Sequence, residues 1–228
     1  MNPPAKIKTQ ASRSPLWAWL AIVVALIAFA SLAQEAREGG INAFDRLTLS
    51  ILNAPTSFST APPWVQESTR DITALGGFTV LALIATFAAA MMLQYRQRYQ
   101  ALIFVLTVIL SQALTEGVKA IIARPRPTLV SQHDIVYSLS FPSGHTTMST
   151  VVYLTLAAIV CRALRRPGAR ALALGAAICL TLAIGITRIE LGVHWPTDVL
   201  AGWLLGSAIA LVAIKALNQK DYWPARAS

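Results

Sequence analysis

The sequence predicts an all-α membrane protein, a polytopic bundle of six transmembrane helices. Of its 228 residues 55% are hydrophobic and only 13% are charged, which excludes an ordinary soluble domain of this length. The apolar residues also form six runs of roughly 20 residues, the length at which a helix crosses a bilayer. The six runs are 15–33, 73–93, 101–122, 146–164, 169–187 and 198–217.

These runs define one membrane domain at 15–217, with polar tails at 1–14 and 218–228. A longer outer segment at 34–72 separates the first run from the second. Within it, the sequence INAFDRLTLSIL has the partly helical spacing of apolar residues that suits a helix on the membrane surface. We expect this segment either to pack over the bundle or to contact a ligand.

The distribution of Lys and Arg predicts that both termini are cytoplasmic. With six spans, twelve of the 19 basic residues share the side of the termini with one carboxylate, and seven share the other side with nine carboxylates. Cytoplasmic loops carry the excess of Lys and Arg. We therefore expect an integral protein whose other polar clusters face outward. Its small size and short loops indicate a bacterial plasma membrane.

The basic residues admit two other interpretations. A net charge of +9 could indicate nucleic-acid binding, but the cytoplasmic cations flank separate apolar helices and form no single basic face. Anionic lipid headgroups explain them better. The first run could instead be a signal peptide, because Lys6, Lys8 and Arg13 precede it and Ser31-Leu32-Ala33 resembles a cleavage site.

The first of three polar clusters follows the third apolar run. Lys119 and Arg126 leave the membrane together there, because two prolines prevent the helix from continuing regularly. The planar fork of Arg and the mobile charge of Lys suit an anion with several oxygens, such as phosphate. Glu116 is spaced to orient Lys119. Arg124 is interpreted as a cation that snorkels at the helix end.

The second cluster, Pro142-Ser143-Gly144-His145, turns the chain into the fourth helix. Ser143 can cap that helix, and Gly144 lets backbone N–H groups approach a ligand closely. The start of the helix therefore predicts an anion site. His145 is a candidate proton donor beside it.

The third cluster joins the last two helices. Arg188 follows the fifth run, and His194 lies four residues before Asp198, a spacing that lets the two side chains meet. A carboxylate that holds one imidazole nitrogen makes the other more nucleophilic. Alternatively, Asp198 only stabilises a helix dipole. Trp195, with other tryptophans, is assigned to the membrane-interface belt.

No metal or other cofactor is expected. A zinc site built from His133, His145 and His194 is the alternative, and the absence of tight His and Cys ligand spacing argues against it. Cys161 and Cys179 are too few for a disulfide framework or a cysteine-rich metal site.

These clusters resemble the three-part signature of the type 2 phosphatidic acid phosphatase family: K-x6-R-P, P-S-G-H and S-R-x5-H-x3-D. Ten specified positions match in order and spacing, and only the serine before Arg188 differs, being Thr187. The resemblance implies a six-helix membrane enzyme that removes phosphate from lipid phosphates or diphosphates without a metal. Its active site would lie at the extracytoplasmic membrane interface.

By this resemblance, His194 would attack phosphorus to form a phosphohistidine, oriented by Asp198, and His145 would protonate the leaving oxygen. These roles need a neutral His194 and a protonated His145, so the pH profile is expected to be bell-shaped. The remaining positions would hold the phosphate oxygens. They are Lys119, Arg126, Ser143, Gly144 and Arg188.

Undecaprenyl diphosphate is the expected substrate of an outward-facing site, and phosphatidylglycerophosphate, phosphatidic acid and lipid A phosphates remain open. A phosphotransferase of the same family would pass the phosphate to a second lipid. A vanadate-dependent haloperoxidase shares the motifs, but six spans argue against that soluble enzyme. A lipid or anion transporter would place polar residues and broken helices at the bilayer midplane. Here the polar residues gather at one interface.

Overall fold

The structure is a computed structural model that describes residues 16–39, 41–52, 58, 60–128, 134 and 138–218. In these residues every regular element is a helix, which confirms the predicted all-α fold. Nearly all of the two predicted tails falls outside them. The helices are α1 (Leu16–Arg37), α2 (Ala43–Leu52), α3 (Pro63–Ala74), α4 (Phe78–Gln94), α5 (Arg98–Ile122), α6 (Gly144–Ala163), α7 (Pro167–Glu190) and α8 (Pro196–Asn218).

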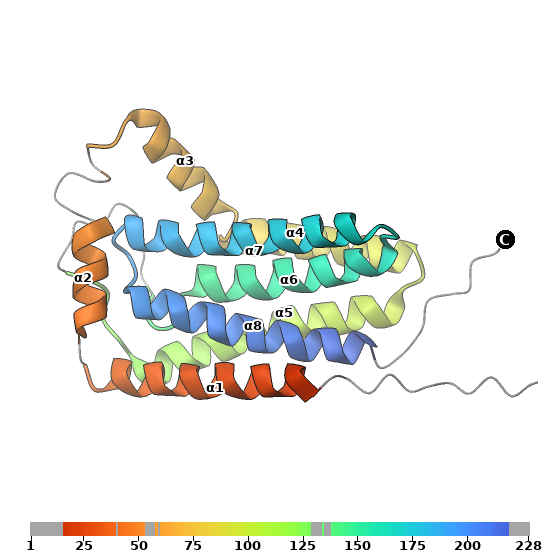
Figure 1. Cartoon of the computed structure of the whole chain (residues 1–228), viewed down its shortest axis with the longest axis horizontal. Coiled ribbons are helices and arrows are strands. Elements are labelled where there is room, and N and C mark those ends of the chain that lie inside the picture. The colour runs from red at the N-terminus through yellow and green to blue at the C-terminus, as the bar shows by residue number, and fades with distance from the viewer. Residues whose placement is uncertain are drawn as a thin grey trace, which may run out of the picture.

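The long helices α1 and α4 to α8 lie side by side as one bundle (Figure 1). Five of them, α1, α5, α6, α7 and α8, are each long and apolar enough to cross a membrane. The pair α3 and α4 passes the same test together, with a bend of 49° between them. The first turn of α1 and the last turn of α8 lie at the same end of the bundle (Figure 1).

The bend between α3 and α4 corrects the predicted second span at 73–93. Helix α3 ends at Ala74, and α4 starts only at Phe78. Gly76 and Gly77 lie between them, and glycine is a poor helix former. The hydroxyl of Tyr153 donates a hydrogen bond to the carbonyl of Leu75 (2.8 Å), which satisfies a backbone acceptor at the break.

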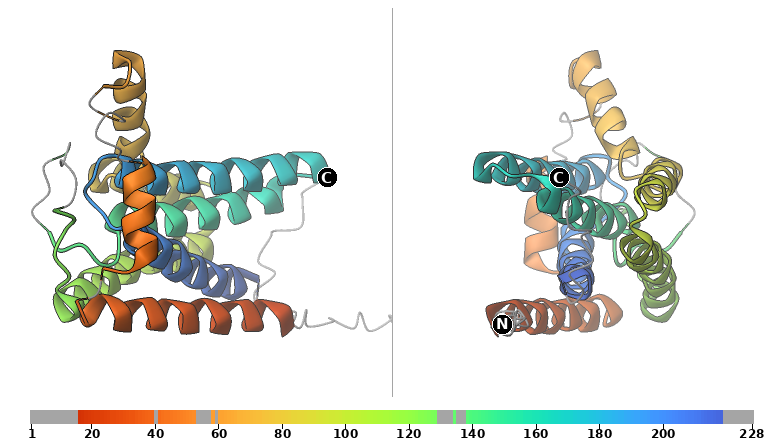
Figure 2. Two further views of the ribbon diagram at one scale, coloured as in Figure 1. Left: turned by 60° about the vertical axis from the view of Figure 1, so that its left-hand side comes forward. Right: turned by 90° about the vertical axis from the view of Figure 1, so that its right-hand side faces the viewer.

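Helix α2 forms within the outer segment, where the sequence has its partly helical pattern. It crosses the end of the bundle and does not run along it (Figures 1 and 2). Leu49 on its inner face is buried against Ile189, Trp195 and Val199 of the bundle. Asp45 on the same face is fully buried. The segment therefore packs over the bundle through a charged side chain as well as an apolar one.

Helices α6 and α8 pack closely because two glycines of α8 face threonines of α6. A Cβ atom built on Gly202 would lie 2.9 Å from the Cβ of Thr146, and one on Gly206 would lie 2.7 Å from the Cβ of Thr150. Small residues allow such close approach between membrane helices, where van der Waals packing drives association. This contact brings the starts of the two helices together.

We expect Gly206→Ala to lower the thermal stability of the purified protein in detergent. The added methyl group would overlap α6 and cost about 1–3 kcal/mol. The matched control is Gly175→Ala in α7, where an added Cβ meets no atom within 4 Å. Equal melting temperatures for the two variants would contradict the close packing of α6 and α8.

Candidate active site

The predicted site residues come together at one end of the bundle, around the starts of α6 and α8. The backbone N–H of Ser143 donates to the carbonyl of Asp198 (3.1 Å), which joins the two helix starts directly. The cations arrive from the ends of α5 and α7 and from the segment after α5. The gathered residues are Lys119, Arg126, Ser143, Gly144, His145, Arg188, His194 and Asp198.

His194 and Asp198 meet as their spacing predicts. The Nδ1 atom of His194 lies 3.4 Å from Oδ2 of Asp198. Because an ionised carboxylate only accepts hydrogen bonds, this contact places the imidazole hydrogen on Nδ1. The Nε2 atom then presents a lone pair, and Nη1 of Arg126 lies 3.2 Å from it. Both His194 and Asp198 are almost completely buried.

The surroundings of His194 keep its imidazole neutral. Burial lowers its pKa to about 4, because desolvation disfavours the charged form. The hydrogen bond and charge of Asp198 oppose this shift, while the positive charges of Arg126 and Arg188 add to it. Burial and the charge of Arg188 also lower the pKa of Arg126, to about 10, so this guanidinium stays charged at neutral pH.

Lys119 and Arg126 share a partner that the sequence analysis did not identify. The hydroxyl of Ser138 accepts hydrogen bonds from Nζ of Lys119 (3.3 Å) and from Nη2 of Arg126 (3.1 Å). Its carbonyl accepts a third from Nε of Arg126 (2.8 Å). Glu116 lies 3.6 Å from the Lys119 ammonium, one helical turn away, as predicted. Ser138 thus links the two cations, of which Lys119 is buried and Arg126 is half-buried.

Arg188 is buried with part of its hydrogen-bonding capacity unused. One nitrogen, Nη1, donates to Thr73 (2.9 Å) and to the carboxylate of Asp134 (3.0 Å). Its Nε and Nη2 atoms are buried and have no hydrogen-bond partner among the described residues. Leaving buried guanidinium donors unpaired is costly, so this arrangement favours an anionic ligand that accepts from both.

The start of α6 lies close to the Lys119 ammonium. A Cβ atom on Gly144 would lie 3.4 Å from the Lys119 ammonium, so the glycine leaves the space between them open. Ser143 occupies the N-cap position, but its side chain makes no capping hydrogen bond, which corrects that part of the prediction. It instead accepts one from Thr146 (2.9 Å). His145 lies beside the break between α3 and α4, close to Gly76 and Gly77.

Arg124 corrects the prediction that it snorkels at the membrane surface. Its side chain is only 4% exposed and lies between two buried carboxylates. It donates to Asp198 (2.6 Å), to Asp45 of α2 (2.8 Å) and to the hydroxyl of Thr197 (2.7 Å). Trp195 was assigned to the interface belt, but it is likewise buried inside the protein and does not face lipid: Arg124 lies over its ring, and its indole N–H donates to the carbonyl of Pro125.

The chain leaves its helical path after α5, just before two nearby arginines that have different partners. Ala123 ends the helix in the left-handed conformation (φ 51°), and prolines follow both Arg124 and Arg126. A residue before proline favours an extended backbone. The two arginines nevertheless have different partners. Arg124 bonds to the buried carboxylate of Asp198, and Arg126 bonds to Ser138.

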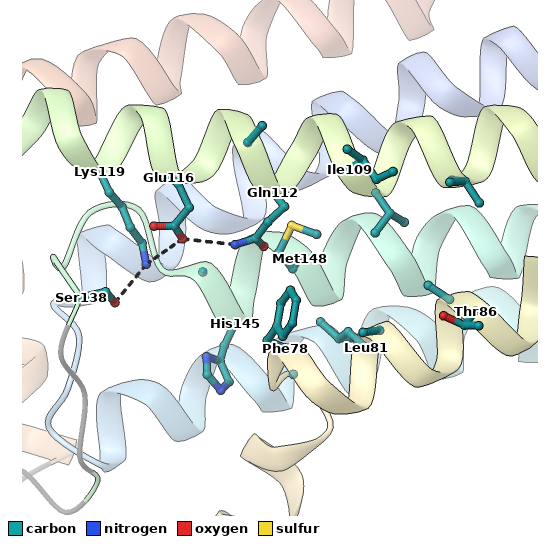
Figure 3. Close-up of a pocket in the computed structure, with 17 residues that line it drawn as sticks. Phe78, Leu81, Thr86, Ile109, Gln112, Glu116, Lys119, Ser138, His145 and Met148 are labelled. Atoms are coloured by element: carbon teal, nitrogen blue, oxygen red, sulfur yellow. Dashed lines mark hydrogen bonds and ion pairs between the residues drawn. The ribbon is translucent and has the colours of Figure 1, made fainter.

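An apolar cleft of about 650 Å³ continues from the polar residues into the bundle. Lys119, Gly144 and His145 line one end of it. Figure 3 shows Glu116 and Gln112 next along α5, followed by apolar side chains of α4, α5 and α6. The cleft therefore suits a molecule with an anionic head and an apolar body. Its labelled apolar residues are Phe78, Leu81, Ile109 and Met148.

Other partners at the site were not predicted from the sequence. Asp198 also accepts from the hydroxyl of Ser140 and from the backbone N–H of Trp195 (2.9 Å). No group of three or more His, Cys, Asp or Glu residues suited to a metal occurs in the described part of the chain. His133, a member of the alternative zinc set, lies outside that part.

Comparisons with known proteins show the family of the chain. Residues 100–222 match the PAP2 superfamily. The chain is 31% identical to phosphatidylglycerophosphatase B of Bacillus subtilis over 69% of its length and 77% of that protein. It is 28% identical to an undecaprenyl-diphosphatase of Sulfolobus acidocaldarius over 56% of this chain and 60% of that protein.

A solved structure has the same fold. The crystal structure of a transmembrane PAP2-type phosphatidylglycerolphosphate phosphatase from Bacillus subtilis superposes with a TM-score of 0.76 at 26% identity, covering 89% of this chain and 98% of the other. The matched motif residues, the membrane-spanning bundle and these relatives lead to one assignment. The chain belongs to the PAP2 superfamily and is an integral membrane phosphatase that hydrolyses phosphate esters.

Proposed function

We propose that the chain hydrolyses the terminal phosphate of a lipid phosphate or diphosphate through a phosphohistidine on His194. The observation that carries this proposal is that the buried Nε and Nη2 atoms of Arg188 have no partner among the residues that the structure describes. Together with Lys119 and Arg126 they supply positive charge where a phosphoryl group would meet Nε2 of His194. The equatorial oxygens of a phosphoryl group spread negative charge that such donors stabilise in the transition state.

In the first step, Nε2 of His194 attacks phosphorus while the bond to the leaving oxygen breaks. His145 gives its proton to that oxygen, so that the lipid leaves as a neutral alcohol or as a monophosphate. The Asp198 carboxylate holds the Nδ1 hydrogen and stabilises the positive charge that develops on the ring. Arg126, already 3.2 Å from Nε2, would move to a phosphate oxygen.

In the second step, water attacks phosphorus from the side that the lipid has left. His145, now neutral, accepts a proton from this water, and the phosphorus–nitrogen bond breaks to return His194. Inorganic phosphate then leaves. Ser143 and the backbone N–H of Gly144 would bind phosphate oxygens at the start of α6 throughout, where the helix dipole favours an anion. No step requires a metal ion or another cofactor.

Undecaprenyl diphosphate is the proposed substrate. The apolar cleft beside Lys119 and His145 supports a long hydrocarbon chain that enters from the bilayer between α4 and α5. The resemblance to an undecaprenyl-diphosphatase also supports it. Phosphatidylglycerophosphate is the second candidate, favoured by the resemblance to phosphatidylglycerophosphatase B.

We also propose that the site faces the exterior of a bacterial plasma membrane. Arg96 lies between α4 and α5, and Arg98 begins α5. Arg162 lies in the last turn of α6, and Arg165 and Arg166 lie between α6 and α7. Both connections are at the end of the bundle opposite to the site (Figure 1). Because cytoplasmic loops carry the excess of basic residues, that end would be cytoplasmic.

We expect His194→Ala to lower kcat for lipid phosphate hydrolysis by at least about a thousandfold, because the nucleophile is lost. Phosphate release by the wild type should persist in EDTA. Labelled substrate should leave an acid-labile phosphate on the wild-type chain and none on the variant. Wild-type turnover without any trapped phosphoenzyme, under rapid quenching, would argue for direct attack by water.

His145→Ala should behave differently with an aryl phosphate, whose leaving group departs without a proton. Phosphoenzyme formation should then remain fast, while its hydrolysis slows about a hundredfold or more, because the general base is missing. The measurement is a burst of aryl alcohol followed by a slow steady state. Equal slowing of burst and steady state would assign His145 to binding instead.

The pH dependence of phosphoenzyme formation should report a neutral nucleophile. Burial lowers the pKa of His194 to about 4, so the ring is neutral above that pH and protonated below it. The burst rate in His145→Ala should therefore fall as the pH drops through about 4. A midpoint near the ordinary value of about 6.5 would show that burial does not hold this imidazole neutral.

Substrate ranking should place undecaprenyl diphosphate first. We expect its kcat/KM to exceed that of phosphatidylglycerophosphate and of phosphatidic acid by about tenfold or more in mixed micelles of one detergent. Release of phosphate that required an added lipid acceptor would instead identify a phosphotransferase. A preference for phosphatidylglycerophosphate would replace the proposed substrate and leave the proposed chemistry intact.

A further inference from the structure

Two buried charged residues, neither of them a specified position of the three-part signature, hold the start of α8. Arg124 and Asp45 are both buried, and each reaches residues in the first turn of that helix. Asp45 comes from α2, which crosses the end of the bundle (Figure 2). Together they connect the outer segment of the chain to Asp198, the partner of His194.

Arg124 determines which oxygen of Asp198 faces the imidazole. Its Nη1 atom holds Oδ1 at 2.6 Å, in a charge-assisted hydrogen bond. The other oxygen, Oδ2, is then turned toward Nδ1 of His194 and the N–H of Trp195. Without Arg124, Oδ1 would lose this partner and the carboxylate could rotate.

Asp45 fixes both Arg124 and the backbone of α8. Its Oδ2 atom accepts from Nη2 of Arg124 (2.8 Å) and from the hydroxyl of Thr197 (2.8 Å). Its Oδ1 atom accepts from the backbone N–H of Thr197 (2.9 Å). That N–H lies in the first turn of α8, where helices leave donors unsatisfied. Asp45 therefore caps α8 from another helix.

We propose that Asp45 and Arg124 are positioning residues, which hold the Asp198 carboxylate in line with the imidazole of His194. Helix α2 is then part of the catalytic apparatus, although no residue of it touches the reacting atoms. This inference rests on the proposed function, because it assigns a role to the partners of the proposed nucleophile.

An electrostatic consequence separates this role from simple bracing of α2. His194 is faced by Asp198 of α8, by Arg126 after α5 and by Arg188 of α7. His145 of α6 faces the same site, and Thr73 of α3 and Asp134 accept hydrogen bonds from Arg188. The Arg124 charge offsets that of Asp198, so its loss should raise the pKa of His194.

Loss of the Asp45 charge should shift the pKa of His194 in the opposite direction. Arg124 would then pair with Asp198 alone, and the net charge near the imidazole would become more positive. The pKa of His194 should fall or stay low as a result. A residue that merely braced α2 would lower stability in both variants and leave the ionisation of the nucleophile unchanged.

The test measures burst kinetics against pH, with an aryl phosphate and full-length protein in detergent. The acid limb is the pH range in which the burst rate falls because His194 becomes protonated. In Arg124→Gln the midpoint of this limb should rise by about one pH unit or more, with kcat at least about tenfold lower and KM within about twofold. In Asp45→Asn kcat should also fall, with no upward movement of the limb. The double variant Asp45→Asn/Arg124→Gln should bring the limb back toward the wild-type position.

Arg124→Lys keeps the charge but cannot bridge both carboxylates in the same way. In this variant the acid limb of the burst rate should have the wild-type midpoint, while kcat should be lower. The variant also tests the proposal if Arg124→Gln does not fold. Matched controls are Arg46→Gln on the exposed face of α2 and Asp71→Asn on the exposed face of α3, both with wild-type kinetics. Melting curves establish that each variant is folded.

Two results would overturn the inference. One is a folded Arg124→Lys or Asp45→Asn with wild-type kcat. The other is an acid limb that stays fixed in folded Arg124→Gln. Failure of the proposed function would look different, because the wild type itself would then form no phosphohistidine and His194→Ala would match it.

Discussion

The close contact of α6 with α8 determines the geometry of the site. Gly202 and Gly206 remove the side chains that would hold these helices apart. The starts of the two helices consequently meet, and the backbone N–H of Ser143 bonds to the carbonyl of Asp198. Each helix start carries partial positive charge. The packing of small residues deep in the bundle thus creates a place for an anion at its end.

Buried arginines around this place fall into two kinds, distinguished by their partners. Arg124 lies between two fully buried carboxylates, so its charge is already compensated by the protein. Arg188 is as deeply buried, but its carboxylate partner, Asp134, is 41% exposed, and two of its nitrogens have no partner in the described residues. The unused donors of Arg188 favour an anionic ligand, whereas the charge of Arg124 is already paired with Asp45 and Asp198. The partners of these arginines therefore distinguish Arg124, which two buried carboxylates hold, from Arg188, the proposed phosphate-binding residue.

Local and periodic features could be predicted from the sequence, and contacts between distant segments could not. Apolar runs predicted the membrane bundle because a bilayer requires long apolar helices. Spacings of three and four residues predicted the pairs Lys119–Glu116 and His194–Asp198. Lys119 and Glu116 share a face of α5, while His194 precedes α8 and reaches Asp198 in its first turn. Asp45 and Arg124 are 79 positions apart, and no local pattern relates them.

The incorrect expectations have the same origin. A cation after an apolar helix was assigned to the membrane surface, and a tryptophan beside it to the interface belt, because those are the usual places for such residues. The structure buries Arg124 against Trp195 because Asp45 and Asp198 supply compensating charge there. The bend before α4 was missed for a related reason. Gly76 and Gly77 weaken the helix, but His145 and Ile184, which pack against Gly76, come from other helices.

Burial gives the proposed nucleophile its useful protonation state, and the cleft explains how a substrate still reaches it. An exposed imidazole would be partly protonated near neutral pH. Desolvation keeps His194 neutral, and the carboxylate behind it holds the Nδ1 hydrogen, which leaves Nε2 as the reactive atom. The cleft past Lys119 and His145 is apolar, so this side of the site can be open to the bilayer. A lipid phosphate can then bring its charged head to the arginines while its chain stays in an apolar environment.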